Sequence, residues 1–349
     1  MSTTTKIFLT GATGYIGGSI LTRLLAHPDR PSFELTALVR NPDAAKKLAA
    51  LGVKTISGSY DDLALLTDAA AQADVVFTMV CVTVWDQLPP AQAILAGLKQ
   101  RFEQTSKPPI LIHTSGAGIV MDITAHGHSG AQDTYSDLDA ETLASRPGKA
   151  LPMAVESALV RADEEGYVRS YLITPGTIFG LAKGPLVDLG VQHKHSLQLP
   201  LFFRTFIKRG RAATIGPGLN VWPAVSYNDN ADLYLRLFDA ARSSSSSVGH
   251  GREGFYFAES CEYSALEIAQ ASGRVLHKLG VAEVREPDEF SEEQVQASFG
   301  AFWEILSSTS RARGERARAQ LGWSPKEGKA ELLASVEREI EELLKDSKL

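Results

Sequence analysis

Three glycines near the start of the chain have the spacing that phosphate binding requires. The largely apolar residues 6–10 predict a strand, and Gly11, Gly14 and Gly17 follow it where a helix-periodic stretch begins. Gly11 allows a sharp turn, Gly14 lets backbone approach a phosphate because it lacks a Cβ, and Gly17 allows close packing of helix on strand. The free N–H groups at the helix start then face the negative charge. The predicted dinucleotide-binding residues of this turn are Gly11, Thr13, Gly14, Tyr15, Ile16 and Gly17.

The residue after the second predicted strand indicates which dinucleotide fits. Residues 34–39 predict that strand and Arg40 follows it, so no carboxylate stands where NAD sites bind the ribose hydroxyls. Arginine is a permanently charged planar fork that suits a 2′-phosphate. We therefore expect NADP(H) rather than NAD(H); a solvated arginine is the alternative.

Two further segments fit a bound dinucleotide. Asp61 follows the third predicted strand, where a carboxylate can hydrogen-bond the adenine amino group, and Asp62 is expected to cap the next helix. Val80 and Cys81 stand at the end of the fourth predicted strand. Backbone at that point would pass the ribose.

These residues need a sheet whose strands end side by side. Apolar strand-like segments alternate with helix-periodic ones through the first half of the chain, which predicts a parallel sheet covered on both faces. The fold class is therefore α/β, a doubly wound parallel sheet of the Rossmann type. The predicted strands are 6–10, 34–39, 53–57, 74–80, 110–114 and 167–173, and the predicted helices are 16–26, 43–51, 63–73, 90–104 and 153–164.

The second half has another pattern. It contains a Gly/Pro-rich stretch over 175–223, a helix over 229–241, a serine-rich linker over 243–247 and a strand over 255–258, followed by mostly helical sequence. We expect a dinucleotide-binding domain of residues 1–180, to which 225–260 return. Residues 181–224 and 261–349 would form a smaller, mostly helical substrate lobe over the C-terminal edge of the strands, where ligands of open α/β sheets bind. The helices expected near the end are 314–323 and 331–344.

Composition excludes several partners. The 349 residues are 44% hydrophobic, as in ordinary globular proteins, and carry a formal charge of −6. Together with a pI near 5.8, this charge argues against nucleic acid or an anionic membrane as partner. The two cysteines, Cys81 and Cys261, are far apart, so we expect neither a disulfide framework nor a cysteine metal site. No apolar run reaches membrane-spanning length.

The last three residues carry an address. Ser347, Lys348 and Leu349 form the tripeptide that the peroxisomal import receptor reads. We expect a peroxisomal protein if the source is a eukaryote, with the cytoplasm as the alternative. The polar residues 2–5 lead directly into the first strand, which leaves no room for a signal peptide.

The sequence resembles the extended short-chain dehydrogenase/reductase superfamily. It is most similar to the atypical branch of NAD-dependent epimerase/dehydratase-like and NmrA-like proteins, and the resemblance covers most of the chain. The segments that carry it are 11–17, 38–40, 58–62, 113–116, 174–180, 225–233 and 321–325.

The resemblance implies roles for residues beyond the glycine turn. Ser115 would hydrogen-bond the substrate oxygen, and the backbone of Pro175, Thr177 and Ile178 would hold the nicotinamide carboxamide. The superfamily also uses a Tyr-x-x-x-Lys pair, in which the ammonium lowers the pKa of the tyrosine for proton transfer. No tyrosine of this chain has a lysine four residues later, and the two positions fall near Gly148 and Pro152. The usual proton relay therefore does not carry over.

Two residues could substitute for the missing pair, but each also has a non-catalytic alternative. Tyr135 lies in the long loop over 116–148 and could fold over the nicotinamide, although a packing role is the alternative. Lys149 is close to the lost lysine position, with a solvated lysine as the alternative. Together with Ser115, these are the predicted catalytic residues.

We expect roles other than metal binding for the histidines. His126 and His128 could supply an acid, but no convincing third ligand accompanies them, so we expect no metal. His113 is expected to be a buried, hydrogen-bonded core residue. The polar residues over 192–198 fall where the second lobe of this superfamily meets substrate, and we expect them to form a solvated loop.

Three functions remain open at this stage. The first is an NADP(H)-dependent oxidoreductase that reduces a small organic carbonyl, imine or enone with a non-standard proton donor. The second is an NADP(H)-sensing, NmrA-like regulatory protein without turnover. The third is a non-redox isomerase, lyase or cyclase on the same scaffold. The expected partner is a small-molecule substrate, and a homodimer is left open.

Overall fold

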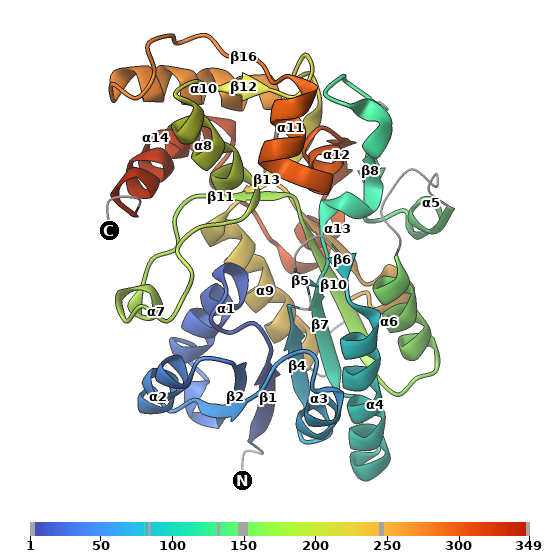
Figure 1. Cartoon of the computed structure of the whole chain (residues 1–349). Helices are drawn as coiled ribbons and strands as arrows, with labels where there is room; N and C mark the ends of the chain where they lie inside the picture. Colours follow the sequence, from blue (N-terminus) through green and yellow to red (C-terminus); the bar gives the residue numbers. More distant parts are fainter. Residues whose placement is uncertain are drawn as a thin grey trace.

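The computed structural model describes residues 4–79, 81–82, 85–130, 133–145, 153–243 and 248–346. A parallel sheet of seven strands forms its centre, in the order β14-β10-β7-β4-β1-β2-β3 (Figure 1). These strands are β1 Thr5–Leu9, β2 Phe33–Val39, β3 Lys54–Ser57, β4 Val75–Thr78, β7 Ile110–Thr114, β10 Arg169–Pro175 and β14 Phe255–Ala258. The doubly wound α/β fold expected from the sequence is confirmed.

Helices cover both faces of this sheet because successive strand side chains alternate between two apolar layers. Ile7 and Leu9 of β1 pack into the layer shared with α1, α2 and α9, whereas Phe8 packs into the layer shared with α3, α4 and α6. The helices are α1 Tyr15–Leu25, α2 Pro42–Ala50, α3 Leu63–Ala70, α4 Leu88–Thr105, α6 Ala154–Glu164 and α9 Tyr227–Arg242.

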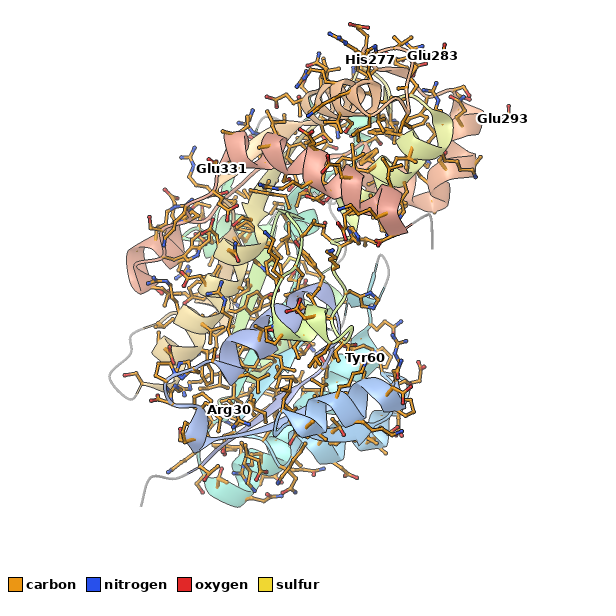
Figure 2. The ribbon with its side chains drawn as sticks, turned by 90° about the vertical axis from the view of Figure 1, so that its left-hand side faces the viewer. Arg30, Tyr60, His277, Glu283, Glu293 and Glu331 are labelled. Carbon is orange, nitrogen blue, oxygen red and sulfur yellow. The ribbon has the colours of Figure 1, made fainter. Side chains whose placement is uncertain are left out.

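A second lobe lies over the carboxyl ends of the strands (Figure 1). It has its own apolar core, built largely from α8, α10, α11 and α14. Figure 2 shows His277, Glu283 and Glu293 at its far end, away from Tyr60 and Arg30 of the sheet domain. Its elements include β11 Thr177–Phe179, α7 Pro185–Asp188, α8 Gln198–Arg209, β12 Ala213–Thr214, β13 Val221–Ser226, β15 Cys261–Ser264, α10 Ala265–Lys278, β16 Asp288–Glu289, α11 Glu292–Phe299, α12 Trp303–Leu306 and α14 Lys329–Asp346.

The fourth predicted strand is shorter than expected. β4 ends at Thr78, which pairs with His113 of β7, and the last residue of β1, Leu9, pairs with Phe77 one residue earlier. Cys81–Val82 forms β5 and instead pairs antiparallel with β6, Trp85–Asp86. The prediction that Cys81 ends the sheet strand is therefore wrong. Val80 itself lies outside the described residues.

The Gly/Pro-rich stretch contains a helix that the sequence did not indicate. α8 spans twelve residues and buries Leu199, Phe203 and Phe206 in the second lobe. Pro200 stands in its first turn, where the missing N–H costs no helical hydrogen bond.

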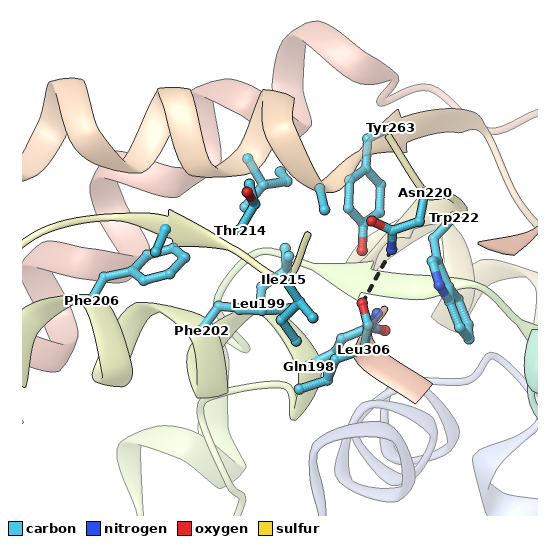
Figure 3. A pocket seen from close by; sticks show the side chains of 13 residues that line it. Gln198, Leu199, Phe202, Phe206, Thr214, Ile215, Asn220, Trp222, Tyr263 and Leu306 are labelled. Carbon is cyan, nitrogen blue, oxygen red and sulfur yellow. Dashed lines mark hydrogen bonds between the residues drawn. The ribbon is translucent and has the colours of Figure 1, made fainter. Parts of the chain in front are cut away.

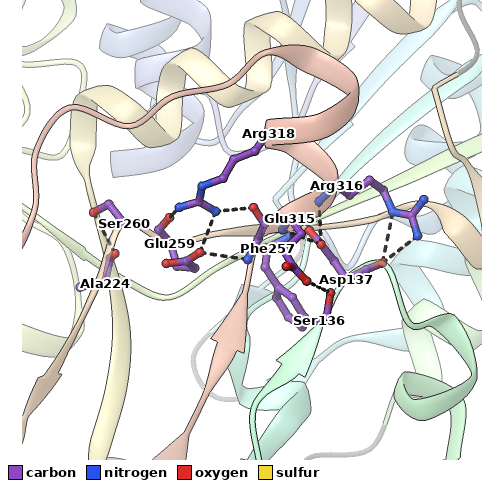
Figure 4. A network of polar contacts seen from close by, with 10 residues as sticks. Ser136, Asp137, Ala224, Phe257, Glu259, Ser260, Glu315, Arg316 and Arg318 are labelled. Atoms are coloured by element: carbon purple, nitrogen blue, oxygen red, sulfur yellow. Dashed lines mark hydrogen bonds and ion pairs between the residues drawn. The ribbon is translucent and has the colours of Figure 1, made fainter.

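A polar network joins the long loop after β7 to the end of the chain (Figure 4). Asp137 accepts hydrogen bonds from the backbone N–H groups of Phe257, Glu315 and Arg316, at 2.8–2.9 Å. The guanidinium of Arg316 donates back to the carbonyl oxygen of Asp137. The network fixes β9, Tyr135–Ser136, and β18, Ala312–Arg313, beside α13, Glu315–Leu321, and β14.

Candidate active site

The glycine turn after β1 is as tight as its sequence predicts. Gly11 has a positive φ of 65°, which favours glycine, and its carbonyl oxygen accepts the N–H of Gly14 at 2.9 Å. A Cβ added to Gly17 would lie 2.1 Å from the carbonyl oxygen of Gly11. Only glycine therefore fits at position 17 without moving the turn.

The N-terminus of α1 presents unpaired donors. The backbone N–H groups of Tyr15, Ile16 and Gly17 have no hydrogen-bond partner within the described part of the chain. The cap residue, Gly14, has no side chain to accept them, and the first turn contains no acidic residue. These groups, with the positive end of the helix dipole, form a site for an anion.

The side chain of Tyr15 has a structural role. Its hydroxyl donates to the carbonyl oxygen of Gly180 at 2.6 Å, and its ring centroid lies 5.0 Å from that of Tyr227. Burial raises the pKa of the Tyr15 phenol well above its ordinary value, so the hydroxyl stays neutral. Tyr15 could therefore contribute to a phosphate site through its N–H group alone.

Residues 181–197, here called the strap, contact the glycine turn directly. The N–H of His193 donates to the carbonyl oxygen of Thr13 at 2.9 Å. The buried amide of Gln192 donates to the Tyr15 carbonyl and the Tyr227 hydroxyl, each at 3.0 Å. The strap is held from its other side by α14, where His195 pairs with Asp346 at 2.9 Å. The expectation of a solvated loop is thus wrong for Gln192 and His195, because α1 and α14 hold the strap between them.

Arg40 stands at the carboxyl end of β2 with its side chain exposed. No residue within the described ranges forms an ion pair or hydrogen bond with its guanidinium. The next residue, Asn41, caps α2 by accepting the N–H of Asp43 at 2.8 Å. The Arg40 guanidinium is thus available to an anionic ligand at this edge.

The segment after β3 bends back toward the glycine turn. Asp61 is exposed and accepts the Ser59 hydroxyl at 3.3 Å, and Asp62 caps α3 through the N–H of Leu65, which confirms the expected cap. Sequence reasoning missed Tyr60, whose hydroxyl donates to the carbonyl oxygen of Met79 at 3.0 Å. A Cβ on Gly11 would lie 2.8 Å from that of Met79, so these side chains form one wall beside the turn.

Ser115 follows β7 and is held beside β10. Its N–H donates to the carbonyl oxygen of Ile173 at 2.8 Å. Its hydroxyl donates to Oε1 of Glu156 at 2.6 Å, and the Glu156 side chain is buried in the first turn of α6. Sequence reasoning gave Glu156 no role, and only its place four residues after the expected lysine position near Pro152 could have drawn attention to it.

The loop after β10 joins the sheet edge to the second lobe. Pro175 pairs with Ala258 of β14, and Ile178 packs into the core beside α1. A Cβ on Gly176 would lie 2.3 Å from the carbonyl oxygen of Pro223, so the loop passes β13 closely. The hydroxyl of Thr177 bonds Gln198 Oε1 at 2.9 Å and the Tyr263 hydroxyl at 2.8 Å.

Gln198 and Tyr263 also line a cavity in the second lobe (Figure 3). Its volume is about 20 Å³, close to the space one water needs, and its walls are mainly apolar. The polar groups at its wall are few, and Asn220 among them donates to the carbonyl oxygen of Leu306 at 3.1 Å. Apolar lining residues are Leu199, Phe202, Phe206, Ile215, Trp222 and Ile268.

Of the two residues expected to substitute for the missing Tyr/Lys pair, the structure describes only Tyr135. Tyr135 lies in β9, and its ring packs against the apolar layer that contains Leu143 and Val155. Tyr135 thus has the packing role that was the alternative, and its catalytic role stays a prediction. Lys149 and the two expected Tyr/Lys positions lie outside the described residues, as do residues 347–349 of the import signal.

The histidines outside the strap have structural surroundings. His113 is buried and its Nδ1 lies 3.1 Å from the Thr78 hydroxyl, which confirms the expected core residue. The ring of His126 contacts that of Trp303 in a tilted arrangement, with 5.0 Å between the ring centroids. Across the described ranges, His, Cys, Asp and Glu side chains form no group of three that could hold a metal ion.

In the same ranges, none of the helices is long and apolar enough to cross a bilayer.

Comparisons with known proteins agree with this architecture. The NmrA-like family model matches residues 3–102. The oxidase ucsJ of Acremonium sp is 30% identical over 341 residues, covering 92% of this chain and 93% of that protein. The 4-hydroxy-2-methyl-3-oxo-4-farnesyl-3,4-dihydroquinoline-1-oxide ketoreductase of Stigmatella aurantiaca is 35% identical over 78 residues, 22% of each chain.

A solved structure shows the same fold over the whole chain. The dTDP-glucose 4,6-dehydratase of Bacillus anthracis, in complex with NAD, superposes with a TM-score of 0.64 at 12% identity and covers 99% of this chain and 98% of its own. The fold is therefore that of the extended short-chain dehydrogenases/reductases. By its sequence, the chain belongs to the NmrA-like family.

Proposed function

We propose that this protein is an NADP(H)-dependent oxidoreductase that acts on a small organic carbonyl, imine or enone. One observation carries the proposal: the ends of parallel strands bring an anion site, an unpaired cation and a buried hydroxyl to the same edge of the sheet. These are the N-terminus of α1, Arg40 after β2 and Ser115 after β7. The order of the strands reverses between β1 and β4, and ligands of such sheets bind at this point.

The residues present fit a phosphorylated dinucleotide. The free N–H groups of Tyr15, Ile16 and Gly17 can bind its pyrophosphate, since no Cβ at Gly14 blocks their approach. The exposed guanidinium of Arg40 can bind a 2′-phosphate with two parallel hydrogen bonds. The backbone of Pro175, Thr177 and Ile178 would hold the carboxamide, and Asp61 would face the adenine.

Ser115 would orient the substrate. When bound, the reduced nicotinamide supplies a hydride. The Ser115 hydroxyl would donate a hydrogen bond to the acceptor oxygen and stabilise the charge that develops on it. Gly116 follows, and no described atom lies within 4 Å of a Cβ built on it, which leaves room beside the hydroxyl.

The second lobe suggests an apolar substrate. The backbone of Thr177, at the start of β11, is assigned to the carboxamide. Its hydroxyl bonds Gln198 and Tyr263 at the wall of the apolar cavity. Opening of this cavity would bring apolar surface next to the reacting edge. Two relatives support redox chemistry by their names, an oxidase and a ketoreductase.

A titration followed by a turnover assay tests the proposal. Purified protein is titrated with NADPH and NADH while nicotinamide fluorescence is followed, and NADPH oxidation is then measured with panels of carbonyls, imines and enones. We expect tighter binding of NADPH and oxidation with apolar members of a panel. Absence of NADPH binding would overturn the proposal.

A second candidate is an NmrA-like protein that binds NADP(H) without turnover. The absence of any tyrosine followed four residues later by lysine favours it. Tight NADPH binding with no oxidation across all three panels would select this candidate over the reductase.

A further inference from the structure

We propose that Glu156 and Ser115 form a two-residue proton relay that replaces the missing Tyr/Lys pair. The inference rests on the proposed function and names the group that supplies the proton. Glu156 Oε1 lies 2.6 Å from the Ser115 hydroxyl oxygen, within the reach that proton transfer needs. The side chains come from different elements, the end of β7 and the first turn of α6.

Burial separates this pair from ordinary surface contacts. Glu156 is 1% exposed and Ser115 is 9% exposed. A carboxyl group in such surroundings is shielded from bulk water, so its proton exchanges through the groups that it contacts. The Ser115 hydroxyl is one such contact and stands at the edge where an acceptor oxygen would bind.

Three other buried carboxylates of the described chain accept backbone N–H groups. Asp137 accepts three backbone N–H groups, and Glu339 accepts the N–H of Gly180 and the Ser335 hydroxyl. Asp229 accepts the N–H groups of Lys326 and Glu327. In contrast, Glu156 contacts a hydroxyl that the fold presents at the ligand-binding edge.

The geometry supports proton transfer in both directions. In reduction, the substrate carbon gains the hydride, its C=O π bond opens onto the oxygen, and the Ser115 O–H bond breaks to protonate that oxygen. The Glu156 carboxyl then gives its proton to the Ser115 oxygen and remains as the carboxylate, which regains a proton from solvent through Ser115 after the product alcohol leaves. In oxidation each step is reversed, so the alcohol proton passes through Ser115 to Glu156.

The position of Glu156 on α6 explains how a glutamate could take this part. The pair it replaces falls near Gly148 and Pro152, and α6 begins at Ala154. Glu156 comes four residues after the lysine position in the sequence and stands in the first turn of α6. The chain thus places an ionisable side chain against the Ser115 hydroxyl at the end of β7.

Kinetics of matched variants test the relay. Glu156→Gln keeps the shape of the side chain but holds no transferable proton. The control is Glu165→Gln at the C-cap of the same helix, where Glu165 pairs with exposed Lys99. We expect Glu156→Gln to lower kcat by about 100- to 10,000-fold and to flatten its pH profile, while the NADPH dissociation constant and the unfolding midpoint stay near wild type. Glu156→Asp should recover part of kcat with a pH-dependent profile.

The Ser115→Ala variant separates a relay from a structural role. If the two groups act in one path, Glu156→Gln combined with Ser115→Ala should be no slower than Ser115→Ala alone. In addition, a carboxyl carbon NMR signal absent from Glu156→Gln should change its titration midpoint in Ser115→Ala, a readout that needs no turnover. Additive losses, or a wild-type pH profile in folded Glu156→Gln, would overturn the relay while leaving the reductase intact. A wild type that oxidises no NADPH would instead reject the proposed function.

Discussion

The side-chain amide of Gln192 donates a 3.0 Å hydrogen bond to the carbonyl oxygen of Tyr15, 177 residues earlier in the chain. The same amide donates to the hydroxyl of Tyr227 on α9. A Cβ on Gly18 would lie 2.4 Å from Gln192 Cγ, so the first turn of α1 has room for this residue only because it carries a glycine. The strap therefore packs directly against the start of α1, next to the glycine turn that we assign to the pyrophosphate.

Gln192→Leu removes both hydrogen bonds and replaces the polar amide with a somewhat shorter apolar side chain. We expect a loss of about 1–3 kcal/mol in the free energy of unfolding and weaker NADPH binding, because the start of α1 loses its anchor. Urea denaturation and a fluorescence titration measure the two effects. His193→Ala is the control, since the exposed His193 contributes its backbone N–H to Thr13 and keeps it after substitution. Equal effects of both variants would contradict this account.

Arg40→Ala should separate the two dinucleotides. A charged hydrogen bond contributes about 1.5–3 kcal/mol, so NADPH binding should weaken about 10- to 100-fold while NADH binding changes little. Lys46→Ala removes a nearby exposed cation of α2 that pairs with Asp43 at 3.5 Å, and it should leave both affinities unchanged. An equal loss for NADPH and NADH in Arg40→Ala would mean that Arg40 does not read the 2′-phosphate.

Sequence patterns predict the sheet well because they report local properties. The apolar segments over 34–39 and 110–114 each match an observed strand within one residue, and the glycine spacing matches the observed turn. The sequence predicts a later end for β4 because residues 79–80 are apolar, although β1 supplies no ladder partner beyond Leu9. Strand ends depend on ladder partners, which a single segment does not reveal.

The contacts that complete the candidate site depend on distant residues. Ser115 and Glu156 are 41 residues apart, and their contact requires that β7 pairs with β10 and that α6 starts beside both. Likewise, the sequence predicts Gln192 to be a solvated loop residue, and only the packing of α1 against the strap shows that it is buried. Their residue types alone carry no signal for such pairings, so the sequence predicted the strands and the glycine turn but not the contact between Ser115 and Glu156.

Two buried carboxylates should respond oppositely to amide substitution, and Glu339 is the first. Burial raises the pKa of Glu339 to about 6, and only Oε1 has hydrogen-bond partners within the described chain. The folded state therefore prefers the protonated form. Its contribution to stability is complete below the ordinary pKa of 4.5 and is lost as the pH rises through 6.

Glu339→Gln keeps an oxygen for Gly180 and Ser335 but cannot ionise. We expect stability like wild type near pH 4 and a gain of about 2 kcal/mol above pH 7, from about 1.4 kcal/mol per pKa unit. Chemical denaturation at several pH values measures the difference. Glu337→Gln, on the exposed side of α14 where Glu337 pairs with Lys278, should show no such gain. An unchanged stability difference from pH 4 to pH 8 would contradict the raised pKa.

Asp137→Asn should destabilise the protein although burial also raises the pKa of Asp137 to about 6. Both carboxyl oxygens accept backbone N–H groups, Oδ2 from Phe257 and Oδ1 from Glu315 and Arg316. An asparagine has one oxygen, so its NH₂ group must face at least one of these donors, which costs about 1–3 kcal/mol at pH 8, where Asp137 is ionised. The control is Asp139→Asn at an exposed site, since asparagine also caps helices well. Stabilisation of Asp137→Asn at pH 8, as expected for Glu339→Gln, would show that desolvation and not the three N–H groups governs this carboxylate.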